Sequence, residues 1–178
     1  MIEHIIIAGS GGQGVMLLGK VLAQAAMLEG KQVAWFPAYG PEVRGGTSHC
    51  MVTISDQEIG SPYITAADTL IILNHPSLER FQGKLKEKGM LILNSSLAKI
   101  NKDAKIQAFQ FPFTDIAIQL GNIKVANMVA LGCFAAASKI IKAKNILKVF
   151  KSIAPAGNPG ILEVNQKALE EGVKLIHG

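Results

Sequence analysis

The apolar positions at the start of the chain predict a strand, a glycine-rich turn and a helix. Residues 4–8 form a β-branched run, and the glycine-rich turn follows it directly. Apolar residues then recur at helical spacing over residues 15–26. Gly30 stands where a helix C-cap is expected, and residues 32–36 have the pattern of a second strand. Together these segments predict a βαβ unit, in which the two strands run parallel.

Strand-forming and helix-forming segments keep alternating along the rest of the chain. Further strands are expected at residues 49–55, 69–73, 90–93 and 105–111. Further helices are expected at residues 76–88, 112–120, 124–141, 143–153 and 166–176. This order predicts a three-layer α/β/α fold with an open, largely parallel sheet and a Rossmann-like first βαβ unit. Because the sequence contains no linker or internal repeat, we expect one domain over residues 1–178, with its ligand or partner edge at the carboxyl ends of the strands.

Composition narrows the class of protein. The 178 residues are 49% hydrophobic and only 17% charged, so some apolar side chains are expected to cover a partner interface. The longest apolar runs stay well short of the roughly 20 residues that cross a bilayer. Residues 1–4 lack the basic start of a secretion signal, so we expect a cytoplasmic protein without membrane contact. The net charge of +5 comes from lysines interleaved with aliphatic residues, which favours solvated helix faces over nucleic-acid binding.

The residue types that usually carry catalysis or bind metals are expected to have structural roles here. Cys50 and Cys133 lie far apart without C-x-x-C spacing, so this chain alone cannot assemble a zinc site or an iron–sulfur cluster. His49 and Cys50 are neighbours, but successive side chains of a strand point to opposite faces, so they are not expected to act as base and nucleophile. Asn127 and Asn165 fall near expected helix starts, where they are predicted to cap free N–H groups.

The glycine turn satisfies the pattern G-x-G-x-x-G at residues 9–14. Between a strand and a helix, the backbone N–H groups of such a turn and the helix N-terminus can hold a phosphate. Dinucleotide binding also needs an acidic residue at the end of the second strand, and residues 34–38 contain none. A nicotinamide cofactor is therefore disfavoured, which leaves a different phosphate ligand or a structural turn. The candidate ligand contacts in this turn are Gly9, Gly11, Gly12, Gln13 and Gly14.

A second glycine-rich segment, residues 39–48, follows the second strand at the sheet edge where α/β proteins place their sites. Glu42 and Arg44 offer a carboxylate and a guanidinium, which can orient an anionic ligand, pair across an interface or pair with each other. The glycine content favours a ligand or interface contact. Glycine costs conformational entropy, so a glycine-rich loop usually occurs where the backbone must adopt a special conformation or approach another group closely. The candidate interface residues are Tyr39, Glu42, Arg44, Gly45 and Gly46, and Arg44 is also a candidate ligand contact.

Several motifs together carry a resemblance to a known family. They are GSGGQG at residues 9–14, YGPEVRGGT at 39–47, IGSP at 59–62, AD at 67–68, NMVALG at 127–132 and N-x-x-A-L-x-x-G at 165–172. In this order they resemble the gamma subunit of 2-oxoacid:ferredoxin oxidoreductases, especially the 2-oxoglutarate and branched-chain types. The resemblance covers nearly the whole chain, and the pairing of GGQG with EVRGG is its most specific part.

The resemblance implies a component of a larger enzyme that is not active alone. The family decarboxylates a 2-oxoacid oxidatively with coenzyme A, giving an acyl-CoA and carbon dioxide, and passes the electrons to ferredoxin. Thiamine diphosphate with magnesium and the iron–sulfur clusters are expected in partner subunits of the alpha, beta and ferredoxin-like delta types, on which this chain docks. The glycine turn and Arg44 are expected to contact coenzyme A or a partner. A stand-alone nucleotide-binding oxidoreductase domain, a scaffold subunit without a ligand, and a homodimer of the isolated chain stay open.

Overall fold

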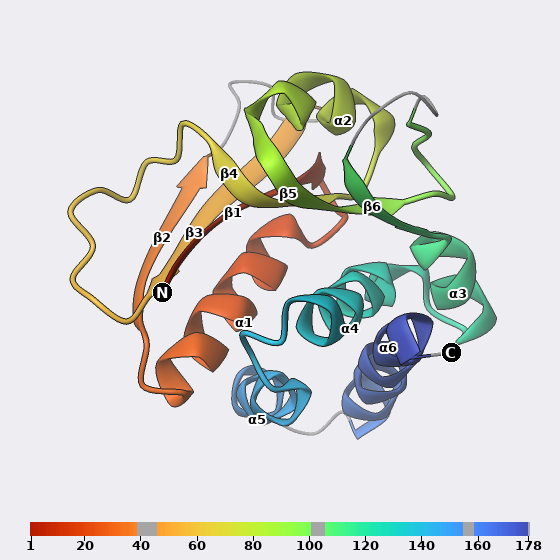
Figure 1. Ribbon diagram of the computed structural model, residues 1–178. Coiled ribbons are helices and arrows are strands. Elements are labelled where there is room, and N and C mark those ends of the chain that lie inside the picture. Colours follow the sequence, from red (N-terminus) through yellow and green to blue (C-terminus); the bar gives the residue numbers. More distant parts are fainter. Residues whose placement is uncertain (39–45, 101–105, 155–158, 178) are drawn as a thin grey trace.

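The computed structural model of the chain describes residues 1–38, 46–100, 106–154 and 159–177. Six strands form one open sheet, and helices lie on both of its faces (Figure 1). The strands are β1 (Ile2–Ser10), β2 (Gln32–Ala38), β3 (Thr47–Ser55), β4 (Ala67–Ile72), β5 (Leu85–Asn94) and β6 (Gln107–Phe111). Their order across the sheet is β2-β3-β1-β4-β5-β6, and the pairs β1–β4, β4–β5 and β5–β6 are parallel. The prediction of an open, largely parallel α/β sheet is therefore confirmed.

One strand departs from the expected topology. β3 lies between β1 and β2 and runs antiparallel to both, pairing Ile7 with Cys50 and Trp35 with Val52. β1 and β2 run parallel and are joined by α1, as the predicted βαβ unit requires, but β3 lies between them, so they are not neighbours in the sheet. The pattern of β3 could not reveal its direction, because residues 50–55 are all buried and are typical of a central strand of either direction.

The sheet separates two apolar layers. Alternate residues of β1 face opposite sides, with Ile5 and Ile7 in the larger layer and Ile6 and Ala8 in the smaller one. The helices of the larger layer, which lie below the sheet in Figure 1, are α1 (Val15–Leu28), α3 (Phe113–Gln119), α4 (Ala126–Ser138), α5 (Ala143–Ile153) and α6 (Pro159–His177). Among the α-helices described, only α2 (His75–Phe81) covers the other face. The expected three layers are present, and one is much thicker than the other.

The helix boundaries agree with the apolar periodicity in part. α5 occupies the predicted residues 143–153. α2 ends at Phe81 instead of residue 88, because residues 85–89 belong to β5. α6 begins at Pro159, earlier than the expected residue 166, and proline is favoured in the first turn of a helix. No helix in the described part of the chain is long and apolar enough to span a membrane.

Candidate functional site

The glycine turn joins the carboxyl end of β1 to the N-terminus of α1, at the sheet edge where α/β proteins place ligands. Gln13 braces this turn. The Ser10 N–H donates to Gln13 Oε1 at 2.7 Å, and Gln13 Nε2 donates to the carbonyl of Leu73 at 3.2 Å. Since Leu73 directly follows β4, the glutamine links the ends of two adjacent parallel strands. Gln13 is a predicted ligand contact, and these hydrogen bonds also give it a structural role.

A buried asparagine extends this link to a third strand. Asn94 ends β5 and is 0% exposed. Its Nδ2 donates to the Leu73 carbonyl at 3.0 Å and to Thr114 Oγ1 at 2.8 Å, and its Oδ1 accepts from the Thr114 N–H at 3.3 Å. Both ends of the buried amide thus have partners, so its burial is not costly. Asn94 is not among the site residues predicted from the sequence. Its position, as a polar residue at the end of an apolar strand, is a sequence pattern that could have indicated this role.

Gly14 is the N-cap of α1 and adopts a left-handed conformation with φ 73°. Asn127 of α4 lies against it, because Asn127 Nδ2 donates to the Gly14 carbonyl at 3.3 Å and a Cβ at Gly14 would overlap the Asn127 amide. Glycine is required here on both counts. The predicted capping role of Asn127 is wrong, since the side chain reaches α1 from inside α4. The same prediction for Asn165 is wrong because it lies within α6 and donates to the Ile161 carbonyl.

A pocket of about 150 Å³ opens beside the glycine turn. Its lining residues are Gly12, Gln13, Leu73, Asn94, Leu97, Thr114, Ile123, Lys124 and Ala126. Two aliphatic side chains of this lining are well exposed, Leu97 at 46% and Ile123 at 58%. A larger hollow of about 470 Å³ also includes Leu97 and is lined by His75, Ser95, Ser96, Ala98 and Lys99. The carboxyl edge therefore combines apolar side chains with hydroxyl groups and the cations of Lys99 and Lys124.

The backbone of the glycine turn is bare where a phosphate would approach. Apart from the turn's own neighbouring residues, no atom of the described residues lies within 4 Å of the place where a Cβ at Gly11 or Gly12 would stand. The start of α1 has no acidic residue in its first turn, and within the described parts of the chain no side chain caps its free N–H groups. These features suit an anion. A structural role for the turn also remains open, because Gln13 donates to the Leu73 carbonyl and Gly14 adopts a left-handed conformation against Asn127.

The second glycine-rich segment ends beside the first. Ser10, at the end of β1, pairs with Thr47 at the start of β3, and Gly46 directly precedes Thr47. The other predicted interface residues, Tyr39, Glu42, Arg44 and Gly45, lie outside the described residues. The structure therefore brings Gly46 to the edge that carries the glycine turn, and the roles predicted for the remaining residues of this segment stay predictions.

The topology also bears on the nicotinamide alternative. In a dinucleotide-binding fold the second strand lies next to the first, which places its terminal acid beside the ribose. Here β3 separates β2 from β1, so the two strands are two spacings apart, about 10 Å. Besides lacking an acidic residue, the end of β2 is displaced from the place where such a residue would act.

The described residues do not fit a metal ion or an iron–sulfur cluster. They contain no group of three or more His, Cys, Asp or Glu side chains placed to hold a metal. Cys50 and Cys133 are both buried, and burial raises the pKa of each thiol to about 12. Since a cluster is held by thiolates, neither cysteine is a fitting ligand.

His49 and Cys50 point to opposite faces of β3, as predicted. His49 packs against Phe81 of α2 with ring centroids 4.8 Å apart, whereas Cys50 Sγ donates to the Val15 carbonyl of α1 at 3.6 Å. Burial lowers the pKa of His49, and the nearby cations Arg80 and Lys84 lower it further. The two neighbours therefore do not form a base and nucleophile pair.

Comparison with known proteins places the chain in a family. The family model for pyruvate ferredoxin/flavodoxin oxidoreductase matches residues 4–175. Ketoisovalerate oxidoreductase subunit VorA of Methanothermobacter marburgensis is 39% identical over 169 residues, which are 95% of this chain and 35% of VorA. The 2-oxoglutarate synthase subunit KorC of the same organism is 36% identical over 184 residues, covering 99% of this chain and 97% of KorC.

Solved structures agree with these relatives. The gamma subunit of a keto/oxoacid ferredoxin oxidoreductase from Geobacter sulfurreducens PCA has a TM-score of 0.88 and 31% identity, covering 99% of this chain and 97% of that one. A 2-oxoglutarate:ferredoxin oxidoreductase from Magnetococcus marinus shares the fold, with a TM-score of 0.92 at 21% identity, over 99% of this chain and 31% of that one. This chain thus spans about a third of the length of VorA and nearly all of KorC. The match over residues 4–175 and the identities to VorA and KorC show that the chain belongs to the pyruvate ferredoxin/flavodoxin oxidoreductase family.

Proposed function

We propose that this chain is the gamma-type subunit of a multisubunit 2-oxoacid:ferredoxin oxidoreductase and is inactive alone. The observation that carries the proposal is its end-to-end likeness to the Geobacter gamma subunit, of which it covers 97%. In the reaction, the bond between C1 and C2 of the 2-oxoacid breaks and carbon dioxide leaves. The coenzyme A thiol loses its proton as its sulfur bonds to C2, and the released electron pair passes to ferredoxin. The names of VorA and KorC favour ketoisovalerate or 2-oxoglutarate as the substrate.

The cofactors of this chemistry belong, in our proposal, to partner subunits. Thiamine diphosphate with its magnesium ion and the iron–sulfur clusters are held by subunits of the alpha, beta and ferredoxin-like delta types. The buried cysteines of this chain support that assignment, because neither offers a thiolate. This chain, one domain over residues 1–178, docks on the thiamine-binding subunits in the cytoplasm and shapes the approach of coenzyme A.

The carboxyl edge of the sheet supports a contact with coenzyme A. That ligand combines a pyrophosphate and an adenosine with a long arm that ends in a thiol. The bare backbone at Gly11 and Gly12, with the start of α1, suits the pyrophosphate. Lys124 adds a cation, and the exposed side chains of Leu97 and Ile123 suit the less polar parts of the ligand. The Magnetococcus marinus oxidoreductase was solved with coenzyme A and succinyl-CoA bound.

The second glycine-rich segment, residues 39–48, is proposed to add ligand and partner contacts at the same carboxyl edge of the sheet. Arg44 would add a guanidinium for a phosphate or for a partner carboxylate. The remaining candidates contact a partner subunit in this proposal: Tyr39, Glu42, Gly45 and Gly46. What supports the placement is the pairing of Ser10 with Thr47, which brings the end of this segment to the glycine turn.

Reconstitution tests the subunit role. The alpha, beta and delta subunits are co-expressed with and without this chain, and 2-oxoacid-dependent, CoA-dependent reduction of a viologen dye is measured. We expect the chain to co-purify with the complex and the activity to depend on it. A chain that neither joins the complex nor changes turnover would contradict the proposal.

A matched pair of glycine variants tests the ligand role. Neither Gly11 nor Gly83 has a positive φ, and the described residues leave open space for a Cβ at both positions, so both alanine variants should fold. Only Gly11→Ala places a methyl group where the pyrophosphate approaches. We expect it to raise the KM for coenzyme A about tenfold at unchanged kcat, a loss of about 1.4 kcal/mol of binding. If Gly11→Ala and Gly83→Ala show the same KM for coenzyme A, the turn is structural, and the result favours the alternative of a scaffold subunit without a ligand.

A further inference from the structure

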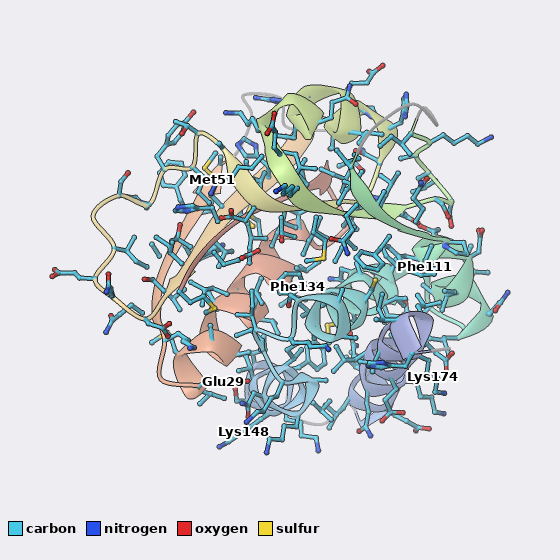
Figure 2. All side chains as sticks on the ribbon, viewed as in Figure 1. Glu29, Met51, Phe111, Phe134, Lys148 and Lys174 are labelled. Carbon is cyan, nitrogen blue, oxygen red and sulfur yellow. The ribbon has the colours of Figure 1, made fainter. Side chains whose placement is uncertain are left out.

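Helix α5 and the turn before it form a strongly basic surface. Residues 139–151 contain five lysines and no acidic residue, and all five lysines are exposed. Lys144, Lys148 and Lys151 recur four and three residues apart and so share one face of α5. In Figure 2, Lys148 points away from the rest of the molecule. Within the part of the chain that the structure describes, these three lysines make no ion pair with a carboxylate.

An apolar groove of about 430 Å³ lies beside this surface, between α5 and α6. Leu147 of α5 lines it from one side, and Leu169 and Val173 of α6 line it from the other. The two rims differ in charge. The α5 rim carries Lys144, whereas the α6 rim carries both signs, with Lys174 paired to Glu171 at 2.7 Å. Of the two lysines that line the groove, Lys144 on the α5 side is therefore the one without an ion pair among the described residues, although its charge also acts on Glu29.

We propose that this groove, the α5–α6 groove, docks an acidic amphipathic helix of another subunit of the same complex. The apolar face of that helix lies on Leu147, Leu169 and Val173, and its carboxylates lie toward Lys144 and Lys148. Helix-in-groove docking uses this combination of an aliphatic floor and a charged rim. Charge complementarity selects an acidic occupant, because like charges four residues apart destabilise a helix until opposite charges approach. The inference rests on the proposed function, since the occupant is a subunit of the complex.

Other classes of occupant fit the α5–α6 groove less well. A bilayer takes up apolar side chains that protrude from an amphipathic helix, and here they line a hollow. A nucleic acid would meet Glu170 at the groove, and the groove has no aromatic side chain on which a base could stack. The relatives favour a protein neighbour. In VorA and in the Magnetococcus marinus oxidoreductase the matching part is only 35% and 31% of a longer chain, so the same fold occurs there as one part of a larger polypeptide.

Charge reversal tests the rim. Lys144→Glu/Lys148→Glu is compared with Lys20→Glu/Lys88→Glu, which makes the same change in net charge at exposed lysines away from the groove. Binding of the purified chain to the complex assembled without it is measured by biolayer interferometry at low and high salt. We expect the first variant to bind about tenfold more weakly at low salt, with the difference shrinking as salt screens the charges. Circular dichroism checks that both variants fold. Equal binding of both variants would overturn the proposal.

A crosslink tests the identity of the occupant. Leu147 is replaced by p-benzoylphenylalanine in the assembled complex, which is irradiated and digested for mass spectrometry. A crosslinked peptide from another subunit, with acidic and apolar residues at helical spacing, is the expected result. A crosslink to a second copy of this chain, or no crosslink in an active complex, would overturn the inference and leave the proposed function intact. A wild-type chain that stays outside the complex would instead refute the proposed function, and this inference with it.

Discussion

Gly132 of α4 and Gly172 of α6 face each other where these two helices cross. A Cβ at Gly132 would overlap the carbonyl of Leu169, and a Cβ at Gly172 would overlap the carbonyl of Val129. The two helices therefore meet backbone to backbone, with no room for even a methyl group between them. This close crossing accounts for the single glycine in each of the motifs at residues 127–132 and 165–172.

Gly172→Ala is predicted to destabilise the protein although alanine is the better helix former. The added methyl group must push α4 and α6 apart, which costs about 1–3 kcal/mol and outweighs a propensity gain of about 1 kcal/mol. Urea denaturation of both proteins gives the difference in the free energy of unfolding. Gly83→Ala, with open space around its Cβ, is the control and should change stability little. A Gly172→Ala protein as stable as wild type would show that the helices separate at no cost.

Gly14 and Asn127 are predicted to be energetically coupled. Gly14→Ala should cost about 1–2 kcal/mol for its left-handed conformation, plus the overlap with the Asn127 side chain. Asn127→Ala removes the overlap but leaves the conformational strain. A double-mutant cycle measured by urea denaturation should therefore show a coupling of about 0.5–3 kcal/mol. Strictly additive effects would mean that the two side chains do not meet.

Asn94→Leu is predicted to destabilise the carboxyl edge of the sheet. The leucine leaves the Thr114 N–H without its side-chain acceptor and takes one of two donors from the Leu73 carbonyl. Leaving buried polar groups unpaired costs about 1–3 kcal/mol. The free energy of unfolding checks this, with Asn122→Ala as the control, since Asn122 makes an exposed bond to the Lys124 N–H. Hydrogen exchange at Thr114 should also become faster, and unchanged exchange would contradict the prediction.

Glu29 is predicted to make stability depend on pH in the acidic range. Its Oε1 accepts from the Lys142 N–H at 2.6 Å and from Asn145 Nδ2 at 2.9 Å, which links the end of α1 to the start of α5 (Figure 2). Burial by itself would raise the pKa of Glu29, but these bonds and the charges of Lys142 and Lys144 lower it below its ordinary 4.5. A lowered pKa means that the carboxylate stabilises the fold above its unfolded pKa, and that this contribution is lost as pH falls through the folded pKa.

Thermal unfolding from about pH 6 down to pH 3 measures the effect. We expect the Tm of the wild type to fall more steeply below about pH 4.5 than that of Glu29→Gln, whose amide cannot titrate. Glu58→Gln, at an exposed position, is the control and should follow the wild type. Identical curves for wild type and Glu29→Gln would show that this carboxylate does not stabilise the fold.

The candidate site was predictable in its local parts. The spacing of glycines after a β-branched run was sufficient to predict a turn between β1 and α1, because that geometry involves only neighbouring residues. The pocket beside the turn was not predictable, since Leu97 and Ile123 reach it from segments far along the chain. The sequence predicts a capping role for Asn127 because the helix around it is evident from local patterns, whereas its contact with Gly14 spans 113 residues.

The sequence by itself determined the alternation of strands and helices, the glycine turn and the bounds of α5. Each of these follows from apolar periodicity or backbone preference within a few residues. Only the tertiary structure decided that β3 is inserted antiparallel between β1 and β2, and that Gly132 and Gly172 meet. Strand order and backbone contact between helices depend on distant segments competing for the same apolar surface. Local patterns report that a segment is buried, but they do not report which neighbour buries it.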